Sequence, residues 1–148
     1  MRFPVKKLVT GSNPVGAAIM NIFILDDDDN RQQTLVSLLK DLLDEPNIFC
    51  AYSRDEAIKI LENNKSFDMI FLDHDLGGRV YVDSSEYNTG WWVAKYIADN
   101  NIQCPQIILH TLNYAGAKNM LGLLKDAVYV PFTNLVKILN DCERNSFG

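Results

Sequence analysis

The chain has 148 residues, the size of one domain, and its 47% hydrophobic and 22% charged residues are typical of a globular protein with a buried core. Its formal net charge of −5 argues against non-specific binding to duplex nucleic acid, which needs a cationic surface. Its 3 scattered cysteines indicate neither a disulfide framework nor a zinc site, and no apolar run approaches the roughly 20 residues of a membrane span, so we expect a cytoplasmic protein that does not enter membranes.

Residues 1–19 differ from the rest of the sequence. Their charged residues are all basic, and glycine, serine, asparagine and proline interrupt any apolar periodicity. No apolar stretch of about 7 residues is present that could serve as the core of a signal peptide. We therefore expect an extension over residues 1–19 and a single domain over residues 20–148.

From residue 21 onward, short apolar runs alternate with amphipathic segments. A strand is predicted at residues 22–25, followed by a helix at residues 31–44 in which leucines recur at helical spacing. A second strand at residues 48–51 precedes a helix that begins at the capping box of Ser53 and Glu56. The remaining strands are expected at residues 69–72, 106–109 and 127–130, and the remaining helices at residues 90–100, 115–125 and 133–143. Five such units predict an α/β three-layer sandwich, a parallel sheet with helices on both faces.

Side chains that can bind a metal or transfer a proton are concentrated directly after three of these strands. The first is followed by Asp26–Asp29, the third by Asp73–Asp75 and the fourth by His110–Asn113. Ligands of open parallel sheets bind at the carboxyl ends of strands. We expect Asp28 and Asp29 to serve the N-terminus of the following helix, where carboxylates are favourable.

Asp26, Asp27 and Asp73 would repel one another strongly if they converge. A hard divalent cation would relieve that repulsion, and oxygen-rich sites of this kind suit Mg²⁺ or Mn²⁺. The chain's 2 histidines, His74 and His110, both follow the same predicted sheet edge. An imidazole there can act as a general acid or base, bind a metal, or simply satisfy hydrogen bonds in the core, and the sequence leaves these roles open.

The run at residues 22–28, Asp73 and the five βα units resemble the receiver domains of response regulators, which have a flavodoxin-like sheet of order 2-1-3-4-5. The resemblance implies that Asp73 accepts a phosphoryl group and that Asp26 and Asp27 hold magnesium. The chain departs from that pattern at two positions. Val130 stands where receivers have a lysine, and His110 or Thr111, depending on a one-residue register, takes the position of a serine or threonine.

These departures resemble a variant group, the cyclic-phosphate-processing receiver-like domains. The resemblance rests on three linked blocks at residues 72–77, 88–91 and 110–120. It implies hydrolysis or transfer at a cyclic phosphate of nucleotides or RNA ends. The residues expected in this site are His74, His110 and Asp73 for catalysis, Asp26, Asp27, Asp73 and Asp75 for the metal, and Thr111, Asn113, Arg79 and Asn88 for phosphate or substrate.

Two functions of different class follow. The first is an enzyme whose ligand is a small phosphate-bearing molecule or nucleotide. The second is a signalling receiver or pseudo-receiver with a protein partner, in which Asp73 is the phosphoacceptor or part of a binding switch. Both functions place the carboxylates and both imidazoles in one pocket. We expect the long loop at residues 76–88 to overhang this pocket, since such loops are often lids or binding elements.

Overall fold

The computed structural model describes residues 19–147, with side chains described as far as residue 143. The expected extension at residues 1–19 therefore lies, apart from Ile19, outside the described residues. Among the described residues, none of the helices combines the length and the apolar character of a transmembrane segment.

The fold is the predicted one, a five-stranded parallel sheet of order β2-β1-β3-β4-β5. The strands are β1 (Asn21–Leu25), β2 (Asn47–Ala51), β3 (Met69–Leu72), β4 (Ile107–Leu109) and β5 (Val128–Tyr129). The helices are α2 (Asp29–Leu42), α3 (Arg54–Asn63), α4 (Gly90–Asp99), α5 (Tyr114–Leu123) and α6 (Phe132–Phe147). Each expected element is present, with ends that differ from the predicted ones by a few residues because the first and last turns carry little apolar signal.

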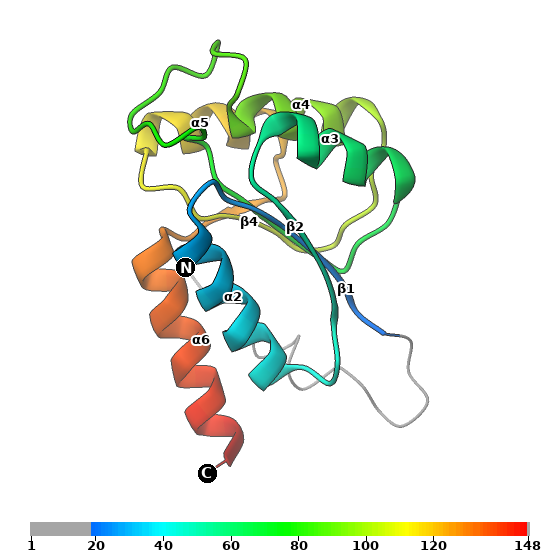
Figure 1. Ribbon diagram of the computed structural model, residues 1–148, viewed down its shortest axis with the longest axis vertical. Coiled ribbons are helices and arrows are strands. Elements are labelled where there is room, and N and C mark those ends of the chain that lie inside the picture. The colour runs from blue at the N-terminus through cyan, green and yellow to red at the C-terminus, as the bar shows by residue number, and fades with distance from the viewer. Residues whose placement is uncertain (1–18, 148) are drawn as a thin grey trace.

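The helices form two layers. Helices α2 and α6 lie on one face of the sheet, and α3, α4 and α5 lie on the other (Figure 1). Each face buries its own apolar cluster. Ile22 and Ile24 of β1 belong to the cluster beneath α2 and α6, whereas Phe23 and Leu25 belong to the cluster on the opposite face. This alternation is the period of two of a β-strand, and it determines which way the residues after each strand point.

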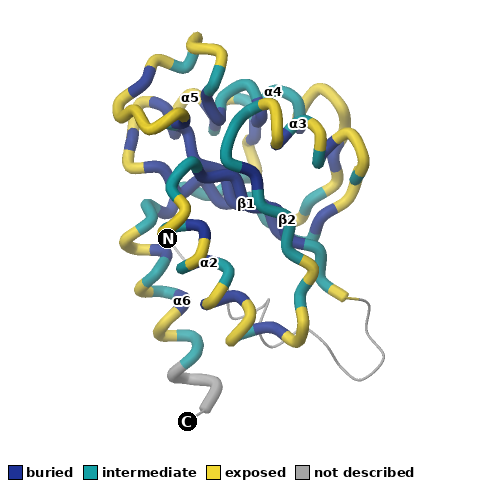
Figure 2. The backbone as a smooth tube through the Cα atoms, viewed as in Figure 1, coloured by how far each residue is buried: buried dark blue, intermediate teal, exposed yellow. Residues whose placement is uncertain are grey.

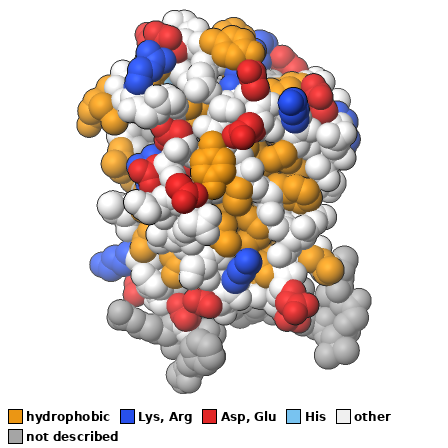
Figure 3. Space-filling model, viewed as in Figure 1, with side chains coloured by type: hydrophobic (Ala, Val, Ile, Leu, Met, Phe, Trp, Pro, Cys, Tyr) orange, Lys and Arg blue, Asp and Glu red, His pale blue; other side chains and the backbone are white. Residues whose placement is uncertain are grey.

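Burial follows the same layers. In Figure 2 the inner strand β1 is largely buried, while yellow, exposed segments lie on the outer sides of the helices. On the face drawn in Figure 3, the lysine and arginine side chains of the described residues lie apart from one another and do not form a cationic patch.

Two helix starts confirm the capping predictions. Asp28 is the N-cap of α2, and its Oδ1 accepts a hydrogen bond from the backbone N–H of Arg31 at 3.0 Å. Ser53 caps α3 by accepting from the backbone N–H of Glu56 at 3.2 Å, and Glu56 accepts in turn from the backbone N–H of Tyr52. These bonds satisfy backbone donors that the first helical turn leaves without partners.

Candidate functional site

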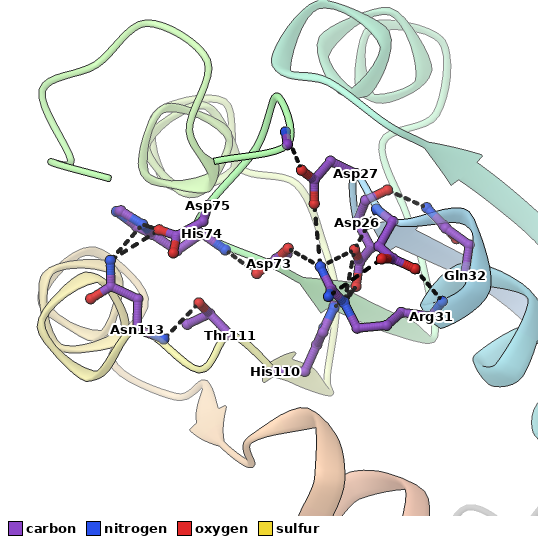
Figure 4. Close-up of polar contacts among 12 residues, drawn as sticks. Asp26, Asp27, Arg31, Gln32, Asp73, His74, Asp75, His110, Thr111 and Asn113 are labelled. Carbon is purple, nitrogen blue, oxygen red and sulfur yellow. Dashed lines mark hydrogen bonds and ion pairs between the residues drawn. The ribbon is translucent and has the colours of Figure 1, made fainter. Parts of the chain in front are cut away.

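The centre of the site is one row of side chains across three strands. Asp26, Asp73 and His110 each follow the last residue of β1, β3 and β4, and the sheet register aligns those last residues. The row continues the backbone ladder, because the N–H of Asp73 donates to Leu25 and the N–H of His110 donates to Leu72, each at 3.0 Å. Strand alternation then turns all three side chains toward the face of α2 and α6 (Figure 4).

The donor set of this row fits a divalent cation. His110 Nε2 lies 2.9 Å from Asp26 Oδ2, and the three residues offer ligand atoms within 4.8 Å of one another. Asp26 is 0% exposed, Asp73 4% and His110 1%. Two carboxylates and an imidazole in such a buried position are a set of ligands that suits divalent metals, and a bound ion would offset the cost of burying the two negative charges.

Arg31 supplies the positive charge at this row, and sequence reasoning assigned it no role. Its Nε and Nη2 donate to Asp26, each with a contact of 2.9 Å. The same Nη2 lies 3.3 Å from Asp27 Oδ1 and 3.4 Å from Asp73 Oδ2. The signal in the sequence was its spacing: a basic residue in the first turn of α2 follows Asp27 by four residues, a separation at which helical side chains meet.

The electrostatics differ among the three carboxyl groups. Burial raises the pKa of Asp73 to about 7. Electrostatic interactions with His110 and Arg31 lower this pKa but only in part, and repulsion from Asp26 and Asp27 adds to the effect of burial. Burial also acts on Asp26, but hydrogen bonds from His110 and Arg31 outweigh it and lower the pKa of Asp26. The pKa of Asp27 is raised, again chiefly by burial. The metal-free row is therefore short of positive charge around Asp73.

A cavity of about 250 Å³ opens beside the row. Of the expected site residues, the structure brings Asp27, Asp73, Asp75, Arg79, His110 and Thr111 to its wall. Asp26 lies buried against Arg31 and His110. Arg79 forms a half-exposed ion pair with Glu86, at 3.4 Å. Val80, Leu112 and Phe132 add apolar surface to the same wall.

His74 is not part of this cavity, so the expected meeting of both imidazoles in one pocket is not observed. It directly follows Asp73, and the strand's period of two turns its side chain to the opposite face of the sheet. There Nδ1 lies 2.7 Å from Asp75 Oδ1 and Nε2 lies 2.8 Å from Ser84 Oγ. The fully buried ring packs directly on α5, where a Cβ at Gly116 would lie 2.5 Å from its Cγ.

Asn113, Asp75 and Asn88 hold the loop at residues 76–88 and its surroundings, and of these Asp75 also lines the cavity. Asn113 is the N-cap of α5, accepting from the N–H of Gly116 at 2.9 Å, and its Nδ2 donates to Asp75 Oδ1 at 3.0 Å. Asp75 also accepts from the backbone N–H groups of Tyr81 and Val82, at 2.6 and 3.2 Å. Asn88 accepts from the backbone N–H of Arg54 at 2.9 Å and, like Asn113, does not line the cavity.

Thr111 is a buried residue whose Oγ1 accepts from the backbone N–H of Asn113 at 3.0 Å. The register question between His110 and Thr111 is answered by the row: His110, not Thr111, aligns with Asp73.

Comparison with known families and structures agrees with this fold. The family model described as "Cyclic-phosphate processing Receiver domain" matches residues 20–126. A signal receiver domain of a putative Luxo repressor protein from Vibrio parahaemolyticus is 17% identical, with a TM-score of 0.60 over 87% of this chain and 93% of that one. The phosphorylated cyanobacterial phytochrome response regulator RcpA is 17% identical, with a TM-score of 0.62 over 85% and 92%.

A third structural neighbour contains a metal. It is the receiver domain of a sensor histidine kinase from Pseudomonas aeruginosa PAO1, with a magnesium ion coordinated in its active site cleft. It is 18% identical, with a TM-score of 0.59 over 85% of this chain and 98% of that one. No curated protein sequence matches the chain.

Proposed function

The chain belongs to the family of cyclic-phosphate processing receiver domains, and from that premise we propose that it is a metal-dependent phosphoesterase that opens cyclic phosphates of nucleotides or RNA ends. The observation that carries the proposal is the row of Asp26, Asp73 and His110, because it joins two carboxylates to an imidazole beside a cavity. This combination suits a metal that acts on a phosphate ester.

Asp26, Asp73 and His110 would hold the ion. Their nitrogen donor favours Mn²⁺ over Mg²⁺, because imidazole is a better ligand for the softer ion. The magnesium in the cleft of the Pseudomonas receiver domain supports a divalent ion at the corresponding edge of this fold. A bound ion would polarise a phosphoryl oxygen and neutralise charge that develops on it.

The cavity's own residues supply the rest of the chemistry. Hydrolysis of a cyclic phosphodiester adds water to phosphorus, breaks one of the two ring P–O bonds, and delivers a proton to the released ribose oxygen. Among the cavity carboxylates outside the row, Asp28 caps α2 and Asp75 holds the loop, which leaves Asp27 to take the proton from water. Its raised pKa brings it closer to the range in which a carboxylate works as a base.

Substrate orientation would come from the cavity wall. Arg79 can place a planar guanidinium against phosphate oxygens, and Val80 and Leu112 give the ribose or base an apolar surface. The volume of about 250 Å³ suits one phosphate and part of its sugar. His74 and Asn113 are proposed to support this wall by holding the loop, through their contacts with Asp75.

The test is turnover of a panel of 2′,3′-cyclic nucleotides with added Mn²⁺ or Mg²⁺. We expect His110→Gln to lose turnover and Mn²⁺ binding together, and Asp27→Asn to lose turnover while it still binds Mn²⁺. Each loss should be at least about 100-fold, the usual range for one acid–base group. Asp41→Asn, an exposed aspartate on α2, is the control and should match the wild type. A wild-type protein that is inactive on the whole panel with either metal refutes the proposal.

The signalling alternative is favoured by one observation, the position of Asp73 at the end of β3 on the cavity wall. In that function Asp73 would accept phosphate from a small donor or act as a partner-binding switch. Val130 argues against it, because a buried apolar side chain stands where a receiver's lysine is expected. A stable beryllofluoride adduct at Asp73 with a coupled shift of α5 or α6, in a protein without turnover, would favour signalling instead.

A further inference from the structure

We propose that Arg31 changes partners at this site. Its guanidinium pairs with Asp26, Asp27 and Asp73 in the metal-free protein, and it binds the phosphoryl oxygens of the ligand once a divalent ion takes the oxygens of Asp26 and Asp73. The inference rests on the proposed metal site and names the residue that couples metal binding to phosphate binding.

The first argument is that the guanidinium and the ion compete for the same oxygens. Arg31 Nη2 lies 2.9 Å from Asp26 Oδ1 and 3.4 Å from Asp73 Oδ2. A divalent ion of the size of Mg²⁺ binds carboxylate oxygens at about 2.1 Å. Two cations that share the same carboxylate oxygens at these distances lie only a few ångströms apart and repel each other, so binding of the ion weakens the hold of these oxygens on Arg31.

The second argument is the balance of charge. Asp26, Asp27 and Asp73 carry up to three negative charges, and Arg31 is the cation that contacts all three. A divalent ion supplies the two positive charges that Arg31 does not. With the ion bound, the carboxylates no longer need the guanidinium, whereas an arriving phosphate brings new negative charge to the same cavity.

The third argument is that Arg31 can reach the ligand without a change of backbone. Its side chain is 33% exposed and lines the cavity, while the start of α2 is fixed by the bond from its own N–H to Asp28. Its Cζ lies 6.0 Å from the centre of the Phe132 ring on the cavity wall. Rotation about the side-chain torsions alone can therefore carry the guanidinium from the carboxylates into the cavity. In Figure 4 it lies between Asp26 and Asp73, on the side of His110.

The experiment is a pair of calorimetric titrations of Arg31→Gln and of Lys40→Gln. Lys40 is an exposed cation of the same helix, so both variants lose one positive charge from α2. In the first titration Mn²⁺ is added to the metal-free protein, and we expect Arg31→Gln to bind it at least about tenfold tighter than Lys40→Gln. In the second, inorganic phosphate is added to the Mn²⁺-loaded protein, and we expect Arg31→Gln to bind it at least about tenfold more weakly. Coupling of this size is typical of linked sites.

Several outcomes would overturn the inference. Mn²⁺ affinity that is unchanged or lower in Arg31→Gln means that Arg31 supports the site rather than competing with the ion. Unchanged phosphate affinity means that it is not a phosphate ligand. If Arg31→Gln does not fold, Arg31→Lys serves instead: it keeps the charge but loses the two-pronged contact with Asp26, and it should still bind Mn²⁺ tighter and phosphate more weakly than the wild type.

Neither titration measures turnover, so the two proposals fail separately. A protein that shows the expected affinities but hydrolyses no cyclic phosphate refutes the proposed function and leaves the role of Arg31. A protein that hydrolyses cyclic phosphates while Arg31→Gln keeps both affinities refutes the role of Arg31 alone.

Discussion

Replacing Asp73 by asparagine should stabilise the metal-free protein at alkaline pH. Asp73 is buried, and its pKa is raised to about 7 from the ordinary 3.8, so the folded protein must either hold a proton there or bury a poorly compensated charge. The folded state thus binds more protons than the unfolded chain between these two values. Stability accordingly falls as pH rises from about 4 to about 7, and the whole penalty is present above that range.

The magnitude follows from the two pKa values. The difference between a pKa of 3.8 in the unfolded chain and about 7 in the folded protein corresponds to a penalty of about 4 kcal/mol at pH 8. At pH 5, where the carboxyl group of the folded protein is still protonated, the penalty is a little over a third of that. Asparagine keeps the shape and removes the charge. We therefore expect Asp73→Asn to exceed the wild type in unfolding free energy by up to about 4 kcal/mol at pH 8 and by about 2 kcal/mol at pH 5.

The assay is urea unfolding of both proteins at pH 5 and pH 8 with a chelator present. A saturating divalent ion in place of the chelator should narrow the gap at pH 8, because the ion compensates the carboxylate in the wild type alone. An Asp73→Asn protein that is equally or less stable than the wild type at pH 8 would show that the row is not short of positive charge, and it would refute the electrostatic reasoning.

Two further predictions concern the network around His74. Gly116→Ala should destabilise the protein by about 1–3 kcal/mol in thermal unfolding, because the added Cβ would overlap the buried imidazole of His74. Gly122→Ala is the control in the same helix: its Cβ meets nothing within 4 Å, so this variant should be neutral or stabilising. Equal effects of the two substitutions would contradict the packing argument. Asp75→Asn should destabilise by about 1–3 kcal/mol at pH 7, because hydrogen bonds from Asn113, His74 and Tyr81 outweigh burial and lower the pKa of Asp75. The contribution of Asp75 to the unfolding free energy is complete above pH 3.8 and is lost as pH falls through the lowered pKa of Asp75. The unfolding free energies of wild type and Asp75→Asn should therefore become equal in acid. A difference between them that persists in acid would contradict this account.

The strands and their carboxyl ends could be predicted because their signals are local. The apolar run of β3 stops at a charged residue, and so does that of β1, which was enough to place Asp26 and Asp73 at one edge. The meeting of Asp26, Asp73 and His110 then followed from parallel strands alone. Asp28 and Ser53 were predicted as caps for the same reason, because a cap depends on the few residues that follow it.

The parts that sequence reasoning missed depend on the direction of side chains. Arg31 belongs to a helix start, where a cation opposes the helix dipole and gives no pattern that suggests a site; three carboxylates brought from two strand ends explain its position. His74 was grouped with His110 because both follow strands of the same edge. The alternation of strand residues, applied at the step from Asp73 to His74, already separates them.

The opposite directions of Asp73 and His74 have a consequence for how this chain can vary in length. A one-residue deletion or insertion within β3 would exchange the two faces, turning the carboxylate toward α5 and the imidazole toward α2. Both networks would then be lost in one event, even though every residue type is kept. Changes of length should therefore be tolerated better after Ser84, at Ser85–Tyr87, where the residues are exposed, than within the four residues of β3.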